Sequence, residues 1–261
     1  MKFAIKLLLI AGALTSFNLV AEDTGENKVK PITGGGEELT QEEVDKKIGR
    51  YGEVDEIPDD FQFNPAEEKL WLSNHLVNIN EPLSLYYEFN KSGSYEEGFT
   101  DSVYLKILEI NEDGTKNAAL DFFTGERKQI VTEDNVTNII GNPVLGIFMQ
   151  GDVYEMGRLT EGHWRYFHKR IKVALREVAK VEQTSFVFNE KEYSGEKVFF
   201  SPYIEDPHRR DFEQFAEKYY EVILSDEIPG SIYQIKTVIP ARGDESAEPL
   251  ILETLTLMDV K

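Results

Sequence analysis

The sequence contains no cysteine in its 261 residues. Disulfide bonds, a cysteine nucleophile and the lipid-bearing cysteine of a bacterial lipoprotein are therefore excluded. Histidine is also scarce, with four in the chain, and His163 and His168 would point about 140° apart on a helix. The patterns G-x-S-x-G, H-E-x-x-H and the P-loop do not occur. We expect no metal site, no cofactor and no conventional catalytic motif, which favours a non-enzymatic role.

The N-terminus has the layout of a secretory signal peptide. Lys2 and Lys6 form a short basic region, an apolar run follows, and Ala21 precedes the first acidic residue. The uncharged stretch 7–21 is shorter than the ~20 residues that a spanning helix needs. We predict cleavage after Ala21 and no stable membrane anchor afterwards. An exported protein without cysteine is typical of the periplasm of a Gram-negative bacterium.

The remaining chain is strongly acidic. Loss of residues 1–21 leaves 26 basic and 48 acidic residues, a net charge of −22. Such a surface repels nucleic acid and anionic membranes and favours solubility. Residues 22–63 are polar, acidic and rich in glycine, so they are predicted to form a mostly disordered linker. Residues 64–261 are predicted to form a single α+β domain.

Alternating apolar residues predict about eight strands. Three precede residue 125, with Leu83, Leu85, Tyr87 and Phe89 on one face of the first, and the others follow residue 183. Between them, residues 143–156 and 160–177 show helical periodicity. The expected fold is a large curved antiparallel sheet, half-barrel-like, with a two-helix insert after the third strand, packed on its concave face.

The second predicted helix is unusual because it is basic and aromatic in an acidic protein. Thr160 is its expected N-cap, and its apolar stripe is Trp164, Phe167, Ile171 and Leu175. The residues off that stripe are mostly basic: Arg165, Lys169, Arg170, Lys172 and Arg176. This basic face would contact acids of the same domain, an anionic ligand or lipid headgroup, or an acidic partner protein.

Carboxylates offer a weaker catalytic alternative. Asp152 and Glu155 lie three residues apart on the first predicted helix, where they would bind a cation, act as acid and base, or simply be solvated or paired with Arg158 and lysines. Glu126 and Arg127 follow a strand, where they form either a polar cluster at the rim of the sheet or an ordinary turn.

Several segments together resemble an uncharacterised family of secreted Gram-negative proteins. They include "LWLSNHL", "FFTGER", "GNPVLGIFMQGDVYEM" and "LSDEIPG", and the resemblance extends from about residue 70 to 240. That family implies no activity and no catalytic residues. The strand count and helical insert are also similar, at the level of fold alone, to the periplasmic lipoprotein-carrier superfamily, whose half-barrel holds acyl chains.

The function that we predict is binding or carrying of an amphiphilic ligand, lipid-like or a lipidated protein, by a soluble periplasmic protein. The candidate ligand-binding residues combine positive charge with apolar surface: Arg165, Lys169, Arg170, Trp164, Phe148 and Arg127. Two alternatives stay open. One is a protein–protein interaction module in envelope assembly, and the other is an envelope hydrolase that uses Asp121, Asp152 or Glu155.

Overall fold

The computed structural model describes residues 62–128, 136–243 and 247–261 of the chain. The expected signal peptide, residues 1–21, and nearly all of the expected linker, residues 22–63, lie outside the described residues. Both therefore stay predictions. In the part of the chain that the structure describes, no helix is long and apolar enough to cross a membrane.

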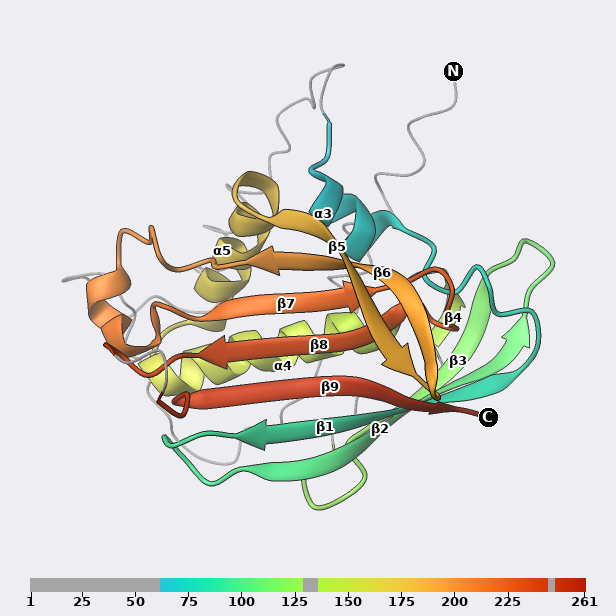
Figure 1. The fold of residues 1–261 in the computed structure, drawn as a ribbon, viewed down its shortest axis with the longest axis horizontal. Coiled ribbons are helices and arrows are strands. Elements are labelled where there is room, and N and C mark those ends of the chain that lie inside the picture. The colour runs from blue at the N-terminus through green and yellow to red at the C-terminus, as the bar shows by residue number, and fades with distance from the viewer. Residues whose placement is uncertain (1–61, 129–135, 244–246) are drawn as a thin grey trace, which may run out of the picture.

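Nine antiparallel strands form one curved sheet in the order β4-β3-β2-β1-β9-β8-β7-β6-β5 (Figure 1). The strands are β1 Leu83–Ser92, β2 Phe99–Ile110, β3 Lys116–Phe122, β4 Val136–Ile139, β5 Lys180–Phe188, β6 Lys191–Phe200, β7 Tyr219–Leu224, β8 Ile232–Ile239 and β9 Ile251–Val260. This confirms the predicted α+β class. The prediction of about eight strands missed β4, whose four residues are too few to show an alternating pattern. The helical insert therefore follows the fourth strand.

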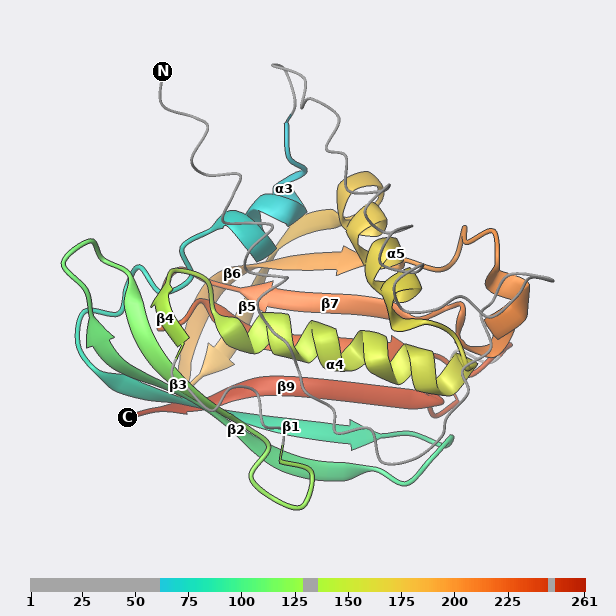
Figure 2. The same ribbon diagram turned by 180° about the vertical axis from the view of Figure 1, so that it is seen from behind.

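Five helical elements accompany this sheet in the described part of the chain. They are α3 Pro65–Glu67, the single π-helical turn η1 Glu68–Leu72, α4 Pro143–Thr160, α5 Trp164–Glu177 and the 3₁₀ helix η2 Arg209–Phe215. Figure 2 shows α4 lying lengthwise across the concave face, with α5 beside it. The predicted arrangement of two helices against the concave face is confirmed.

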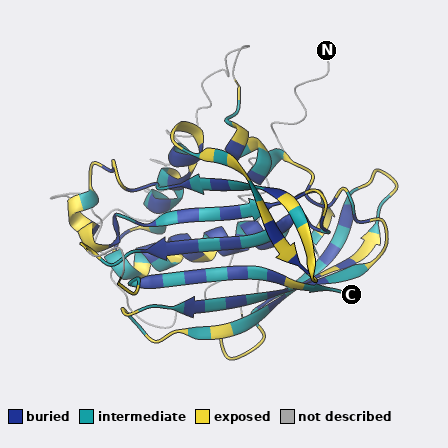
Figure 3. Ribbon diagram, viewed as in Figure 1, coloured by how far each residue is buried: buried dark blue, intermediate teal, exposed yellow. Residues whose placement is uncertain are grey.

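Alternation along the strands decides which side chains face those helices. In β1, Leu85, Tyr87 and Phe89 are buried while the residues between them are partly exposed, and β9 alternates in the same way (Figure 3). Successive side chains of a strand point to opposite faces, so one face of the sheet becomes apolar and needs a cover. The helix α4 provides it with a set of buried apolar residues: Val144, Leu145, Ile147, Phe148, Met149, Val153 and Met156.

The start of α5 differs from the prediction. The helix α4 continues through Gly157 to Thr160, whose hydroxyl donates to the Met156 carbonyl at 2.6 Å. The chain then turns at Glu161, which has φ +54°, and His163 Nδ1 accepts from the Arg165 amide at 3.2 Å. His163 rather than Thr160 is therefore the N-cap of α5, because a single glycine late in α4 does not end that helix.

The hairpin of β5 and β6 bends away from the helices at Gly195. A Cβ atom there would lie 2.6 Å from the Leu224 carbonyl oxygen, so only glycine fits this approach. Beyond the bend, the Phe186 ring stacks on Tyr233 with centroids 4.0 Å apart, and the Tyr233 hydroxyl donates to the Val187 carbonyl at 3.2 Å. The hairpin tip thus folds over the convex face, in front of the sheet in Figure 1.

His75 and Asn142 fix the N-terminal end of α4. The buried His75 ring accepts from the Asn142 amide at 3.1 Å through Nδ1 and contacts the Lys69 carbonyl at 2.7 Å through Nε2, so the proton lies on Nε2. The Asn142 side chain caps Val144 and donates to the Tyr87 hydroxyl. These contacts join η1, β1 and α4 in a single polar cluster.

Replacement of His75 by Phe is expected to lower the free energy of unfolding by about 2–4 kcal/mol, because the Asn142 amide and the Lys69 carbonyl lose their partners. Burial lowers the pKa of His75. As the pH falls, His75 is therefore protonated at a higher pH in the unfolded chain than in the folded protein. Its contribution to stability is fully present above about pH 6.5 and is lost as the pH falls further. Urea unfolding near pH 7.5 and about pH 5.5 measures both effects.

His208→Phe is the matched control, since its side chain is half exposed. It is expected to change stability by less than about 0.5 kcal/mol. Equal losses in the two variants would contradict a structural role for His75.

Candidate functional site

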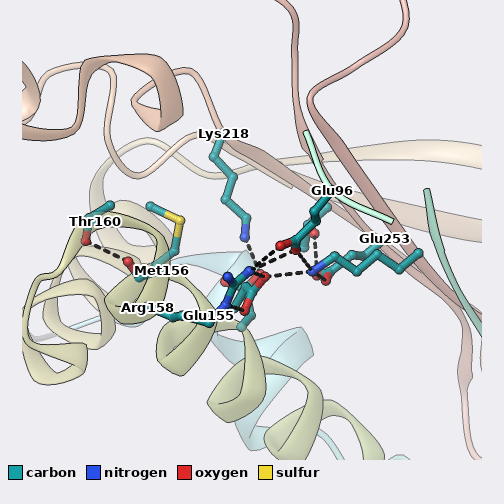
Figure 4. Close-up of polar contacts among 10 residues, drawn as sticks. Glu96, Glu155, Met156, Arg158, Thr160, Lys218 and Glu253 are labelled. Atoms are coloured by element: carbon teal, nitrogen blue, oxygen red, sulfur yellow. Dashed lines mark hydrogen bonds and ion pairs between the residues drawn. The ribbon is translucent and has the colours of Figure 1, made fainter. Parts of the chain in front are cut away.

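Charged side chains meet in the interior between the C-terminal half of α4 and the concave face of the sheet (Figure 4). The helix contributes Asp152 and Glu155, which are three residues apart and both directed at the sheet. The sheet side contributes Lys91 of β1, Lys218 just before β7 and Glu253 of β9. We call these five residues the α4 ion cluster.

The most deeply buried part of the cluster surrounds Asp152. One carboxylate oxygen lies 2.5 Å from Lys218 Nζ, and the other accepts from the Tyr220 hydroxyl at 2.5 Å. Asp152 is 3% exposed and Lys218 is 1% exposed, so neither charge contacts bulk water. The Tyr220 hydroxyl also contacts the Tyr203 hydroxyl at 3.4 Å. The two carboxylate oxygens thus have separate donors, both of which come from the sheet side.

Lys91 binds the second helix carboxylate and two others. Its ammonium lies 2.6 Å from Glu155, 2.6 Å from Glu96 in the β1–β2 connection and 3.3 Å from Glu253. Arg158 closes the outer end with contacts of 2.6 Å to Glu155 and 2.8 Å to Glu96. Lys91 therefore holds one carboxylate from the helix and two from the sheet and its connection.

The charges of this region do not balance. Four carboxyl groups, Glu96, Asp152, Glu155 and Glu253, face three cations, Lys91, Arg158 and Lys218. Burial raises the pKa of Glu253 and so favours its neutral form relative to an exposed glutamate. Burial also opposes ionisation of Glu155, but hydrogen bonds from Arg158 and Lys91 outweigh it and lower the pKa of Glu155 to about 2. Glu155 is thus ionised, and among these four carboxyl groups Glu253 is the one whose pKa burial raises.

A cluster of phenylalanines lies nearer the other end of α4. Phe148 of α4 packs on Phe89 of β1 with centroids 6.3 Å apart, and Phe89 contacts Phe99 and Phe123 at 5.2 and 5.0 Å. The Arg127 guanidinium lies 4.1 Å above the Phe99 ring. Phe99 and Phe123 are half-buried, so this apolar cluster reaches the surface and has a cation at its rim.

The six residues predicted to bind a ligand fall into two groups. Phe148 and Arg127 both belong to the phenylalanine cluster. Trp164 and Arg165 lie at the start of α5, where the guanidinium is 4.8 Å from the indole ring and Tyr154 of α4 packs on that ring at 5.3 Å. The structure therefore links each group to α4 but does not gather all six into one site.

Arg170 and Lys169 complete the second group. The Arg170 guanidinium lies 2.7 Å from the buried carboxylate of Asp206, an ion pair without hydrogen-bond geometry. Asp206 also accepts from the Tyr166 hydroxyl and from the His208 amide. Lys169 is exposed on the outer face of α5. Arg170 thus holds α5 to the chain before η2.

The three carboxylates considered for a hydrolase, Asp121, Asp152 and Glu155, do not lie together. Asp121 pairs with Lys106 at 2.9 Å on the partly exposed face of β3, whereas Asp152 and Glu155 face the concave side. The expected pairing of Glu155 with Arg158 is confirmed, but a solvated position for Asp152 is wrong because the sheet buries it. The three carboxylates share no cleft, which removes the arrangement that the hydrolase hypothesis requires.

A shallow polar pocket of about 260 Å³ lies elsewhere, between η1, the bend of β6 and the β7–β8 turn. Several of its polar groups have partners within the protein: Lys69 pairs with Glu196, Ser225 donates to the Ser194 carbonyl, and Ser231 donates to the His75 carbonyl. Among residues 62–128, 136–243 and 247–261, no three histidine or acidic side chains are grouped to hold a metal ion.

Sequence reasoning missed the sheet half of the ion cluster. Lys91 continues the inward series Leu85, Tyr87, Phe89, and Glu253 stands between the inward Ile251 and Leu255. A charged residue in an inward position of an alternating strand is the signal that would have found both. Lys218 gives no such signal, because it precedes its strand.

The fold belongs to the class of open, curved antiparallel sheets with helices on the concave face. No protein-family model matches the chain, and no curated protein matches it. Among solved structures, the chain is weakly similar to a LolA superfamily protein from Nitrosomonas europaea, with 8% identity and a TM-score of 0.19, over 75% of this chain and 92% of that chain. The resemblance to an uncharacterised family stays a prediction.

Loss of one partner of the buried pair is expected to be far more costly than loss of both. Asp152→Leu leaves the Lys218 ammonium buried without a carboxylate, and it should lower the free energy of unfolding by about 3–5 kcal/mol. Asp152→Leu with Lys218→Met should recover most of that loss, since an apolar pair of similar volume replaces two desolvated charges. Urea unfolding of the two single variants and the double variant measures the coupling.

Lys106→Met is the control, because it removes a partly exposed ion pair with Asp121 and should cost less than about 1 kcal/mol. A similarly small effect of Asp152→Leu would show that the buried pair does not hold α4.

Proposed function

We propose that this protein is a soluble, non-enzymatic periplasmic protein that binds or carries an amphiphilic ligand on the concave face of its sheet. The apolar part of the ligand would lie where α4 now covers the sheet, so α4 has to move for the ligand to enter. Export to the periplasm is proposed from the signal-like residues 1–21.

The proposal is supported most directly by two glycines that weaken α4 although no neighbouring atom requires a glycine there. Gly146 and Gly151 lie inside α4, and a Cβ atom at either position would meet nothing within 4 Å. Alanine would fit both and stabilise the helix by about 1 kcal/mol at each, compared with glycine. The helix that covers the apolar face is thus less stable than it would be with alanine at these positions. Low local stability is typical of elements that move when a ligand binds.

The phenylalanine cluster supplies a place where an apolar chain would start to enter. Phe99 and Phe123 are half-buried at its rim and are continuous with the buried Phe89 and Phe148. Arg127 at the same rim would attract the anionic end of an approaching amphiphile. Apolar walls with a few polar groups are typical of small-molecule sites.

Protein purified from its own periplasm is expected to carry a lipid-like molecule, visible as a mass increment in native mass spectrometry. The ligand-free protein should then take up Nile red, an uncharged dye that fluoresces in apolar surroundings. Protein that is always empty and that takes up no dye would refute the proposal.

Gly146→Ala with Gly151→Ala is expected to raise the free energy of unfolding by about 1–2 kcal/mol and to slow or weaken dye uptake, because a more stable α4 opens less often. Gly157→Ala is the matched control in the same helix, since its Cβ would crowd the Gly162 carbonyl at 3.0 Å and should not stabilise α4. Faster or unchanged uptake by the stabilised double variant would argue against a moving α4.

A second candidate function is an interaction module in envelope assembly, and the outer face of α5 favours it. Within the described residues, no carboxylate lies within 4.0 Å of the Arg165 or Lys172 side chains. In a chain of net charge −20, such a basic face would suit an acidic partner protein. Arg165→Glu with Lys172→Glu should abolish a stoichiometric crosslink in cells while leaving Nile red uptake unchanged. A crosslink that persists in this variant would exclude α5 as the contact surface.

A further inference from the structure

The sheet side of the α4 ion cluster is built as a receptor for a single carboxylate. Lys218 Nζ and the Tyr220 hydroxyl each contact a different oxygen of Asp152 at 2.5 Å. Both donors stay with the sheet if α4 moves, because Tyr220 is part of β7 and Lys218 directly precedes it. The anion at this site therefore comes from α4, which would move, and the donors come from the sheet, which would not.

Lys218 would lose its carboxylate partner if α4 moved away, whereas Lys91 would keep two of its partners. Lys91 keeps Glu96 and Glu253 as partners when Glu155 leaves, since neither belongs to α4. Within the described part of the chain, Asp152 is the one carboxylate within 4.0 Å of Lys218. Departure of α4 would leave this ammonium on an apolar sheet face without an anion.

An unpaired ammonium in that position is costly. Lys218 is 1% exposed with α4 in place, and a ligand that takes the place of α4 would bury it again. A desolvated charge without a partner would then cost several kcal/mol. Glu253 of the sheet interacts electrostatically with Lys218, but its carboxylate contacts Lys91 at 3.3 Å instead. A ligand that replaces α4 would therefore bind best if it supplied an anion to Lys218 and Tyr220.

We propose that Lys218 and Tyr220 bind the anionic head group of the amphiphile, a carboxylate or a phosphate, and that Asp152 occupies this site in the closed protein. The inference rests on the proposed function, since it requires α4 to leave the concave face. The Asp152 carboxylate then acts as an internal mimic of the ligand. It neutralises Lys218 while the site is closed, and the incoming head group replaces it.

The site selects a chemical class of ligand. An amphiphile with an anionic head satisfies Lys218 and Tyr220, whereas a neutral amphiphile of equal chain length leaves the ammonium unpaired. The anionic ligand should therefore bind more tightly than the neutral one. Hydrogen bonds to charged groups are stronger than neutral ones, so we expect a preference of about tenfold or more.

Displacement of Nile red by dodecanoate and by 1-dodecanol measures this preference in the full chain. The wild-type protein should favour dodecanoate by about tenfold or more. Tyr220→Phe keeps the ring and removes one donor, and it should reduce that ratio several-fold. Asp152→Leu with Lys218→Met removes the cation without leaving Asp152 unpaired, and its ratio should fall by about tenfold, because only cations outside this site, such as Arg127, would still favour an anion.

Lys116→Met is the matched control, because Lys116 is another buried lysine of the sheet that donates to the Gly114 carbonyl at 2.7 Å. Its ratio should equal that of the wild type. Loss of the preference in Lys116→Met, or its survival in the Lys218 and Tyr220 variants, would overturn the assignment of the head-group site.

The results distinguish failure of the head-group site from failure of amphiphile binding as a whole. Equal displacement by dodecanoate and 1-dodecanol overturns the head-group site while amphiphile binding stands. Failure of Nile red and of both lipids to bind overturns both. Dodecyl phosphate in place of dodecanoate distinguishes the two anionic classes, since the tighter ligand identifies the head group that the site favours.

Discussion

The contact of Asp152 with Lys218 and Tyr220 is the interaction on which the closed structure depends. It holds the C-terminal half of α4 to the sheet, while Asn142 and His75 hold the N-terminal end. Between these two polar attachments the helix buries apolar side chains against the sheet. Of the two helices on the concave face, α4 is therefore held at both ends by polar groups and packed in the middle by apolar ones.

A design for stability alone would not place charges there. Replacement of a buried ion pair by well-packed apolar residues is often neutral or stabilising. Gly146 and Gly151 point in the same direction, since each weakens α4 where alanine would fit. Compared with an apolar pair and with alanine, both features make the closed position of α4 less stable, and neither is needed for the fold of the sheet. A functional reason for both is the simplest physical account.

The basic helix that stands out in the sequence has a mixed structural role. Arg170 and Arg176 contact the acids Asp206 and Glu67 of the same chain. Arg165 lies on the Trp164 ring, and Phe167, Ile171 and Leu175 are buried as the periodicity predicts. The charges that would meet a ligand on the concave face lie instead on α4 and on the sheet side. A run of cations attracts notice in a sequence, whereas a single inward lysine at the end of an apolar series does not.

Periodicity in the sequence determined the sheet, the helical insert and the apolar face of each element, because alternation and the 3.6-residue repeat are local consequences of backbone geometry. The tertiary structure alone decided that Asp152 meets Lys218 and that Glu155 meets Lys91, since these partners are 66 and 64 residues apart in the chain. No local rule relates residues at such separations, and only the packing of α4 on the curved sheet brings them together.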